Sequence, residues 1–364
     1  MAHEGVFYFG VLASILSKSR LFSFSYIDRY ILLFILLGIV SLGFDIVFGN
    51  SWGGFRAFRW HILTPSIIYI LIRLNEKKVY SRDILSAFLI GSLFSSFILI
   101  SNWLQFESSR NDLNISDSFR LTSSGLVMYI SYSICRFTYS KKYFKGLSYY
   151  YIFCVYITLN RSLFLLIIFL EIYYRFGGRF RLIKYYKSLV IAMGASFVLL
   201  SGFSEIPEVD IEKYKLIQQS DARLFSLELF LFDLFDRVHI WSSFINQNHG
   251  LGWLFGSGLS NIEVGALSEG SQVYGSSHNV FISAYRSMGL IGVFFFLFIT
   301  EKALSTLIDD QKRQVRNSTL LFALIGILSV AFSNDLFTGY RMNYLFFIVG
   351  LIVNERFRLN EIKD

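Results

Sequence analysis

Residues 84–104 read ILSAFLIGSLFSSFILISNWL and contain no charged side chain. A helix of about 20 apolar residues spans the hydrocarbon core of a bilayer, so this segment predicts a membrane-spanning helix. Residues 318–333, STLLFALIGILSVAFS, are also free of charge and predict a second one. These two segments place the chain among integral membrane proteins rather than soluble ones.

The composition of the whole chain agrees with this class. Of its 364 residues, 54% are hydrophobic and only 16% are charged, and the mean hydropathy is +0.51. Such a chain has too little polar surface to cover a water-soluble globule. Its 40 Phe and 22 Tyr, with only 2 Pro, exclude disordered and collagen-like chains. Cys135 and Cys154 both lie inside apolar segments, so we expect no disulfide and no cysteine metal site.

Further apolar segments extend the prediction to a polytopic, all-α integral membrane protein. About eleven segments are long enough to cross a membrane or to fill a shorter position within a bundle. They are residues 5–17, 30–48, 61–74, 84–104, 121–139, 147–159, 162–174, 188–203, 280–299, 318–333 and 341–353. The segments 5–17 and 61–74 are the weakest of these because they are short.

The basic residues indicate how the chain is oriented. It has 34 lysines and arginines and a formal net charge of +8. Alternate connections between the predicted helices hold roughly twice as many of them as the other connections, as cytoplasmic loops do. This pattern predicts an external N-terminus, a cytoplasmic C-terminus and no nucleic-acid partner. It divides the chain into an N-terminal bundle of about eight helices at 1–203, an extracytoplasmic loop at 204–279, and C-terminal membrane helices with a cytoplasmic tail at 280–364.

The loop at 204–279 is the only predicted connection long enough to hold structure of its own. Within it, residues 221–246 carry leucines and aromatics at helical spacing and predict one or two amphipathic helices. Residues 250–275 are rich in glycine and predict ordered turns. We therefore expect a large extracytoplasmic loop with amphipathic helices followed by turns.

The sharpest local feature stands where this loop meets the next membrane helix. His278 and Asn279 are followed, after nine residues, by Gly289 and then by Gly292. A neutral imidazole at the membrane interface can accept a proton near neutral pH. The two glycines are predicted to share one face of the helix and to let a neighbouring helix approach closely. The residues alone leave open whether this is a reactive site or an interfacial histidine beside a packing face.

Three pieces of sequence resemble, in the same order, the bacterial O-antigen polymerase and O-antigen ligase superfamily. The first is NRS at 160–162, between two short predicted helices. The second is DRVHIW at 236–241, followed by GSG at 256–258. The third is HN at 278–279 with GLIG at 289–292. The resemblance covers about the C-terminal two-thirds of the chain, and the first four predicted helices carry no motif of this family.

The resemblance implies a glycosyltransferase that uses an undecaprenyl-pyrophosphate-linked glycan at the periplasmic face of the bacterial inner membrane. Arg161 and Arg237 would bind the diphosphate oxygens and neutralise the charge that develops on them. His278 would remove the proton from the attacking sugar hydroxyl. These three residues are the predicted catalytic residues.

Five more residues are predicted to contact the substrate: Arg223, Arg286, Asn279, Tyr274 and Asp335. Arg223 lies about four turns before Arg237 and can reach the same anion. Arg286 lies two turns into the helix after His278, where a charge is expensive in a membrane. It either faces a polar cavity that holds the carrier's phosphates or pairs with a carboxylate such as Asp335, and the sequence leaves both open.

No metal and no cofactor are expected. The long loop has acidic residues but no Asp-x-Asp pair that would hold a divalent ion against phosphate. Another acidic residue, Asp45, lies near the outer end of its predicted helix and is placed to pair with Arg56 or Arg59. The predicted enzyme is therefore metal-independent.

Three functions remain open at this stage. A polymerase would join the growing glycan to a lipid-linked repeat unit, whereas a ligase would pass it to lipid A–core. The family resemblance is shared by both, and composition favours the polymerase. A lipid-linked glycan flippase or secondary transporter would also have many helices and buried charges. The predicted partners are the undecaprenyl-pyrophosphate-linked oligosaccharide and the lipid bilayer, and a chain-length regulator protein is a further candidate.

Overall fold

The computed structural model describes most of the predicted membrane helices and part of the long loop. The described residues are 25–74, 81–108, 115–139, 142–158, 160–175, 241, 245, 250–262, 266–267, 273–274, 279–311, 318–333 and 341–361. Within these ranges the elements, in chain order, are α2 (Tyr26–Val47), α3 (Ser51–Phe58), η2 (Arg59–Leu63), α4 (Thr64–Leu74), α5 (Ser81–Ser108), α6 (Ile115–Phe137), α7 (Lys142–Ile157), α8 (Arg161–Arg175), α12 (Gly252–Phe255), η5 (Leu259–Ile262), β1 (Ala266–Leu267), β2 (Val273–Tyr274), α13 (Val280–Gln311), α14 (Ser318–Ser333) and α15 (Arg341–Glu361).

The described part of the chain is almost entirely helical, which confirms the prediction of an α-helical membrane protein. Among the described residues, three helical stretches are long and apolar enough to span a bilayer: Tyr26–Val47, Asp83–Gln105 and Val280–Leu307. Shorter apolar helices lie at Ser162–Ile172, Thr319–Ala331 and Arg341–Asn354. The predicted helices at 5–17 and 188–203 and the helices at 221–246 lie outside the described residues, apart from two isolated positions, so about eleven crossings stay a prediction.

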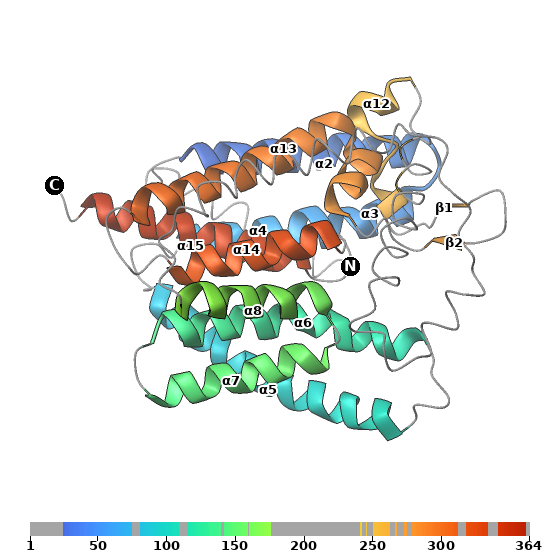
Figure 1. Ribbon diagram of the computed structural model, residues 1–364. Helices are drawn as coiled ribbons and strands as arrows, with labels where there is room; N and C mark the ends of the chain where they lie inside the picture. The colour runs from blue at the N-terminus through green and yellow to red at the C-terminus, as the bar shows by residue number, and fades with distance from the viewer. Residues whose placement is uncertain are drawn as a thin grey trace.

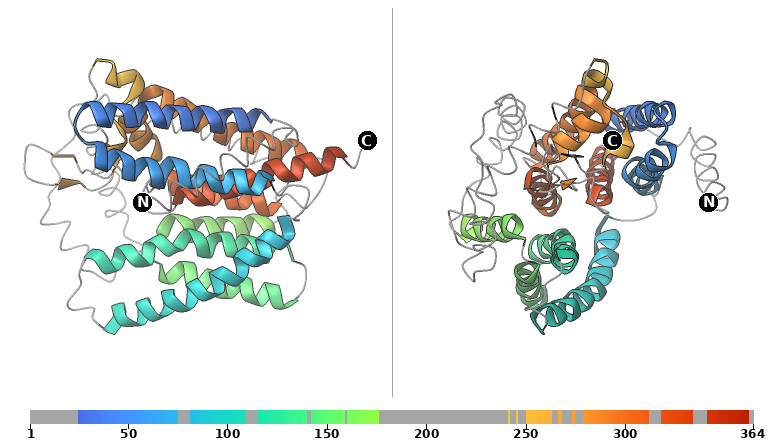
Figure 2. Two further views of the ribbon diagram at one scale, coloured as in Figure 1. Left: turned by 180° about the vertical axis from the view of Figure 1, so that it is seen from behind. Right: turned by 90° about the vertical axis from the view of Figure 1, so that its right-hand side faces the viewer.

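The helices form two groups with their axes roughly along one direction (Figure 1). One group contains α2, α4, α13, α14 and α15, and the other contains α5 to α8. Two further views show the same division (Figure 2). One end of the bundle carries α3, α12, η5 and the antiparallel pair β1–β2, in which Ala266 pairs with Tyr274. We call this the loop end, and the chain's C-terminus lies at the opposite end.

The two groups are joined mainly where α14 packs on α6. Tyr129 donates a hydrogen bond of 3.0 Å to the carbonyl of Phe322, and the hydroxyls of Thr138 and Thr319 lie 2.9 Å apart. Gly326 lets the Tyr129 ring approach the α14 backbone, because a Cβ there would lie 1.9 Å from a ring carbon. Small residues and interhelical hydrogen bonds are the usual means of joining helices within a membrane.

Helix α5 is attached by hydrogen bonds between serine and tyrosine hydroxyls. Ser92 lies 2.6 Å from the Tyr151 hydroxyl on α7, and Ser96 lies 2.7 Å from that of Tyr150. The other side of α5 exposes large apolar side chains, including Phe94 and Phe97. Exposed apolar surface of this extent suits contact with lipid rather than water.

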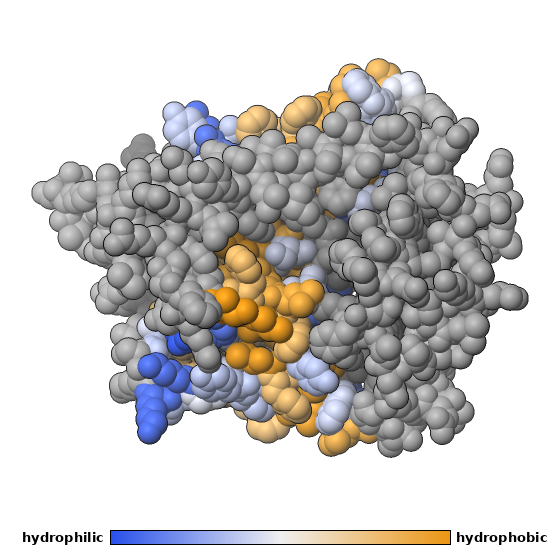
Figure 3. Space-filling model, in the orientation of Figure 1, coloured by the Kyte–Doolittle hydropathy of each residue, from blue (hydrophilic) through white to orange (hydrophobic). Residues whose placement is uncertain are grey.

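The exposed side chains of the described helices suit contact with a bilayer. On the face shown in Figure 3, the described residues are apolar around the middle and hydrophilic near the end that holds the C-terminus. On α2, a run of leucine, isoleucine and valine side chains is also exposed, at Leu32, Leu33, Leu36, Ile39 and Val40. The described helices therefore present apolar side chains to their surroundings along much of their length.

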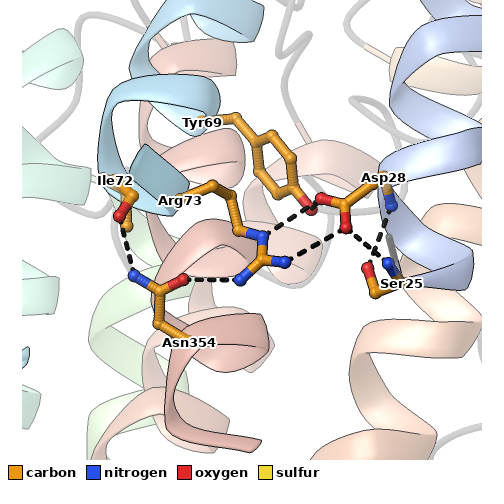
Figure 4. Close-up of polar contacts among 6 residues, drawn as sticks. All are labelled: Ser25, Asp28, Tyr69, Ile72, Arg73 and Asn354. Atoms are coloured by element: carbon orange, nitrogen blue, oxygen red, sulfur yellow. Dashed lines mark hydrogen bonds and ion pairs between the residues drawn. The ribbon is translucent and has the colours of Figure 1, made fainter. Parts of the chain in front are cut away.

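A buried polar cluster joins three helices at the end where α2 begins, which is opposite the loop end in Figure 1. Figure 4 shows its contacts. Arg73 of α4 donates to both carboxylate oxygens of Asp28 at the start of α2, over 3.1 and 3.2 Å. It also donates to the side-chain oxygen of Asn354 on α15, over 2.9 Å. Tyr69 donates to Asp28 over 2.6 Å, and the Asn354 amide donates to the Ile72 carbonyl. The buried charges of Asp28 and Arg73 are therefore paired and hydrogen-bonded, as charges away from water must be.

Candidate functional site

The centre of the candidate site is a break in helix α13 at the loop end. Gly289 has φ 66° and ψ −165°, which is not helical, so α13 consists of two parts, 280–288 and 290–311. This region of backbone conformation is essentially restricted to glycine. The sequence predicted one continuous helix in which Gly289 and Gly292 share a face. The structure corrects this, because Gly289 turns the chain instead of packing within a regular helix.

The segment 252–258 fits into this break. Gly256 has φ 80°, and a Cβ on it would lie 2.3 Å from backbone atoms of Ser287 and Met288. In return, a Cβ on Gly289 would lie 2.2 Å from the carbonyl of Leu254. Two backbones therefore touch at two glycines, and neither position has room for a side chain. Figure 1 shows α12, which begins this segment, beside the first part of α13.

Ser257 binds the backbone that the break exposes. Its N–H donates to the carbonyl of Arg286 over 2.9 Å, and its hydroxyl donates to the same oxygen over 3.0 Å. In an unbroken helix this carbonyl would accept the N–H of Leu290. A carbonyl without a donor is costly inside a membrane protein, so these two bonds stabilise the break.

Arg286 lies in the last turn before the break and is 7% exposed. The sequence left open a polar cavity or an ion pair with Asp335 for this residue. Asp335 lies outside the described residues, so the choice between them stays a prediction. The structure places the backbone of Arg286 directly beside Ser257.

A buried carboxylate holds the next part of the same segment. Asp45, in the last turn of α2, is 2% exposed. Its Oδ2 accepts the N–H of Leu259 over 2.7 Å and that of Ser260 over 3.1 Å, and its Oδ1 accepts the Ser260 hydroxyl. These N–H groups begin the 3-10 helix η5, whose first donors have no partner within the helix. From the sequence, Asp45 was expected to pair with Arg56 or Arg59. In the structure it accepts two backbone N–H groups and one hydroxyl from the start of η5.

Two glycines make room for this carboxylate. A Cβ on Gly258, which has φ 106°, would lie 2.3 Å from Oδ1 of Asp45. A Cβ on Gly54 of α3 would lie 2.5 Å from its Oδ2. The Phe255 ring also packs on Phe44, one residue before Asp45, with ring centroids 6.4 Å apart. The carboxylate thus occupies a slot between α3 and the loop that only glycines leave open.

Asn279 begins α13 as its N-cap. Its side-chain oxygen accepts the N–H of Phe281 over 2.8 Å and that of Ile282 over 3.3 Å. Asparagine is among the preferred residues at this position because it satisfies donors of the first turn. Asn279 is fully buried. Its predicted contact with substrate is not tested by these bonds and stays a prediction.

Arg161 is the first residue of α8, which begins at the loop end (Figure 1). Asn160 precedes it and caps the helix, since its side-chain oxygen accepts the Ser162 hydroxyl over 2.9 Å and the N–H of Leu163 over 3.3 Å. The side chain of Arg161 lies outside the described set. The same end of the bundle therefore holds the starts of α8 and α13, two of the three places where sequence analysis expected catalytic residues.

Most of the remaining predicted site residues lie in parts of the chain outside the described ranges. Arg223, Arg237, His278 and Asp335 lie outside the described residues, and only the backbone of Tyr274, in β2, is described. Among the side chains that the structure describes, no group of three or more His, Cys, Asp or Glu could hold a metal ion. Metal-independent chemistry stays a prediction.

Sequence reasoning missed the roles of Asp45, Ser257 and the π-helical turn η2 (Arg59–Leu63). The position of Asp45 did offer a signal. A carboxylate in the last turn of a membrane helix interacts unfavourably with the helix dipole and therefore needs donors from elsewhere in the chain. The sequence contains no comparable signal for the partner of Ser257. The π-helical turn contains the buried His61 and follows directly from α3.

Comparisons with known proteins identify no relative of this chain. No family model, no curated protein and no solved structure matches this chain. The resemblance to the O-antigen polymerase and ligase superfamily is therefore an expectation that rests on short motifs.

Proposed function

We propose that this protein is a membrane glycosyltransferase that polymerises O-antigen or a related surface polysaccharide. The donor would be a glycan on undecaprenyl pyrophosphate, and the acceptor would be a lipid-linked repeat unit. The observation that carries this proposal is the docking of Gly256-Ser257-Gly258 into the break of α13 at Gly289. Two of the motif pieces, distant in the sequence, form one local structure beside the buried Arg286.

The chemistry of a lipid diphosphate suits the loop end. A helix N-terminus attracts anions through its free N–H groups and its dipole, and α8 starts there with Arg161. An arginine can bind two phosphate oxygens at once. We propose that Arg161 and Arg237 hold the diphosphate and that this end faces the periplasm. Arg223, Arg286, Tyr274 and Asp335 would contact the rest of the substrate.

The proposed reaction is a direct displacement. The acceptor's hydroxyl oxygen bonds to the anomeric carbon of the donor while the bond from that carbon to the diphosphate breaks. The hydroxyl proton passes to His278, and undecaprenyl diphosphate leaves as an anion neutralised by the arginines. His278 directly precedes Asn279, whose cap on α13 fixes the adjoining backbone.

The decisive experiment uses the purified protein in liposomes with undecaprenyl-pyrophosphate-linked repeat units. Wild-type protein should give a ladder of polymer on a gel. His278→Ala should be expressed normally and give none, whereas His249→Ala, a change in the same loop, should leave the ladder intact. Full-length polymer from His278→Ala would show that this histidine is not the base.

The arginine role has its own test in the same assay. Loss of one donor to a developing anion costs on the order of 3 kcal/mol, so Arg161→Ala should slow transfer by about a hundredfold. Arg29→Ala at the opposite end serves as the control, because it removes an exposed arginine far from the loop end. Equal rates for the two variants would remove Arg161 from the site.

A ligase is distinguished from a polymerase by its acceptor. A ladder formed without lipid A–core supports the polymerase, whereas transfer that begins only when lipid A–core is added supports the ligase. The assay therefore includes one arm with lipid A–core and one without it.

One observation favours a second candidate, a lipid-linked glycan transporter. Interrupted membrane helices such as α13 also occur at the substrate sites of secondary transporters. A transporter would move radiolabelled carrier-linked glycan across vesicles that contain this protein alone. Glycan movement without any polymer would favour transport over transfer.

A further inference from the structure

The carboxylate of Asp45 is unusual in both its place and its partners. It lies in the last turn of α2, where the helix dipole disfavours a negative charge. It is almost completely buried, which adds a desolvation cost. Three donors offset these costs: the N–H groups of Leu259 and Ser260 and the Ser260 hydroxyl. A charge kept at such a place, with a full set of donors, indicates a role in holding those donors.

The donors belong to the same short segment that enters the break of α13. We call Gly256–Ser260 the clasp segment. At its start, Ser257 binds the Arg286 carbonyl, and at its end Leu259 and Ser260 bind Asp45. Only Gly258 separates the two anchored parts, and it packs directly against the Asp45 carboxylate. The clasp segment therefore links the end of α2 to the broken part of α13.

We propose that Asp45 is a positioning residue that holds the clasp segment in the break of α13 and thereby fixes Arg286. The contact chain runs from the Asp45 carboxylate to Leu259 and Ser260, then through Gly258 to Ser257, and from Ser257 to the carbonyl of Arg286. Loss of the carboxylate releases the end of the clasp segment, and Ser257 then holds the break alone. The consequence for glycan transfer rests on the proposed function, but the mechanical role does not.

The negative charge and both oxygens are needed for this role. Asparagine has the same shape as aspartate, but its amide places one donor group where Asp45 has a second acceptor. The asparagine oxygen can take the place of Oδ2, but its NH2 group then stands where Oδ1 accepts the Ser260 hydroxyl and, over 3.2 Å, the Ser260 N–H. The remaining bonds are to a neutral amide oxygen, which binds these donors more weakly than a carboxylate does. Asp45→Asn is therefore a nearly isosteric change that weakens the clasp without creating a cavity.

The test measures whether the break becomes accessible. Ser287 is fully buried, and its backbone touches Gly256. Its hydroxyl donates to the carbonyls of Ser283 and Ala284 in its own helix, so Ser287→Cys introduces a buried thiol with little disturbance. N-ethylmaleimide labelling of this thiol is measured by mass spectrometry in the full chain. The protein without Ser287→Cys is treated in the same way and reports any reaction of the buried Cys135 and Cys154.

The expected result is a rise of at least tenfold in the labelling rate when Asp45→Asn is added to Ser287→Cys. The matched control is Glu171→Gln, which removes a carboxylate from the ion pair with Arg136, away from the clasp segment. It should leave the rate unchanged. An unchanged rate with Asp45→Asn, or an equal rise with Glu171→Gln, would overturn the proposal.

A milder variant decides the matter if Asp45→Asn is not recovered as a monodisperse protein. Ser260→Ala removes one of the three donors to Asp45 and should raise the labelling rate by a smaller factor. A labelling rate equal to that of Ser287→Cys alone refutes the clasp.

In the polymer assay, Asp45→Asn should raise the KM for the lipid-linked substrate, and a change in kcat alone would contradict positioning of Arg286. Because labelling needs no substrate, failure of the clasp and failure of glycan transfer are distinguished.

Discussion

The break in α13 makes a strong prediction for Gly289→Ala. Alanine adds a single methyl group, which in most helices is favourable. At Gly289 the methyl group would meet a backbone conformation reserved for glycine and the carbonyl of Leu254 at 2.2 Å. The nitrogen of Phe255 would lie 2.5 Å away. All of these are backbone atoms, so no flexible side chain can move aside to make room.

The cost follows from two separate effects. A non-glycine residue held in this backbone region costs roughly 1–3 kcal/mol. Forcing an extra methyl group into a packed interior costs about 1–3 kcal/mol more. Together they predict that Gly289→Ala lowers the free energy of unfolding by roughly 2–6 kcal/mol. If α13 straightens to avoid the strain, the protein loses the Ser257 contacts instead, so this route also destabilises it.

The assay is unfolding of the purified protein in mixed micelles titrated with SDS and followed by tryptophan fluorescence. Gly43→Ala is the matched control, because it lies within α2 and a Cβ there would meet nothing within 4 Å. Replacing a mid-helix glycine by alanine usually adds stability, by up to about 1 kcal/mol. The same substitution should therefore have opposite signs at the two positions. A Gly289→Ala protein as stable as the wild type would mean that the break is not held by the clasp segment.

Three further predictions use the same SDS titration. Arg73→Met should lower the free energy of unfolding by about 3–5 kcal/mol, because it leaves Asp28 buried without its cation. Combining it with Asp28→Asn should cost less than the sum of the two single losses, and additive losses would argue against the pairing. Asn160→Ala should cost about 1 kcal/mol by removing the cap of α8, while Asn160→Asp should keep most of the stability. Tyr151→Phe should cost about 1 kcal/mol through the lost bond to Ser92, and no loss would mean that this bond does not hold α5.

The positions of the membrane helices could be predicted from sequence because apolar runs report directly on burial in lipid. Residues 318–333 were predicted as a helix, and α14 spans Ser318–Ser333. Helix ends were predicted less well where charged residues continue the helix. The helix predicted at 280–299 extends to Gln311, since Glu301 and Lys302 can stay helical outside the apolar region. Hydropathy measures preference for lipid, whereas a helix continues wherever its backbone hydrogen bonds do.

The candidate site was predictable only where local patterns carry the information. Arg161 and Asn279 stand at helix starts as expected, because capping residues and short turns mark such places in sequence. The partners of Asp45 were not predictable. Leu259 lies 214 positions further along the chain, and its bond to Asp45 uses a backbone N–H that every residue type except proline has. The non-helical turn at Gly289 depends in the same way on a backbone brought there by another segment.

The polar cluster at the other end of the bundle has a consequence for how the protein is made. Arg73 and Asp28 are 45 positions apart, so both residues of this pair have been synthesised once α4 is complete. The bond from Arg73 to Asn354 spans 281 positions and closes only when α15 emerges and inserts. A nascent chain that stops before Asn354 therefore lacks the contact that joins α4 to the last helix, and such incompletely packed products are exposed to proteolysis in the cell.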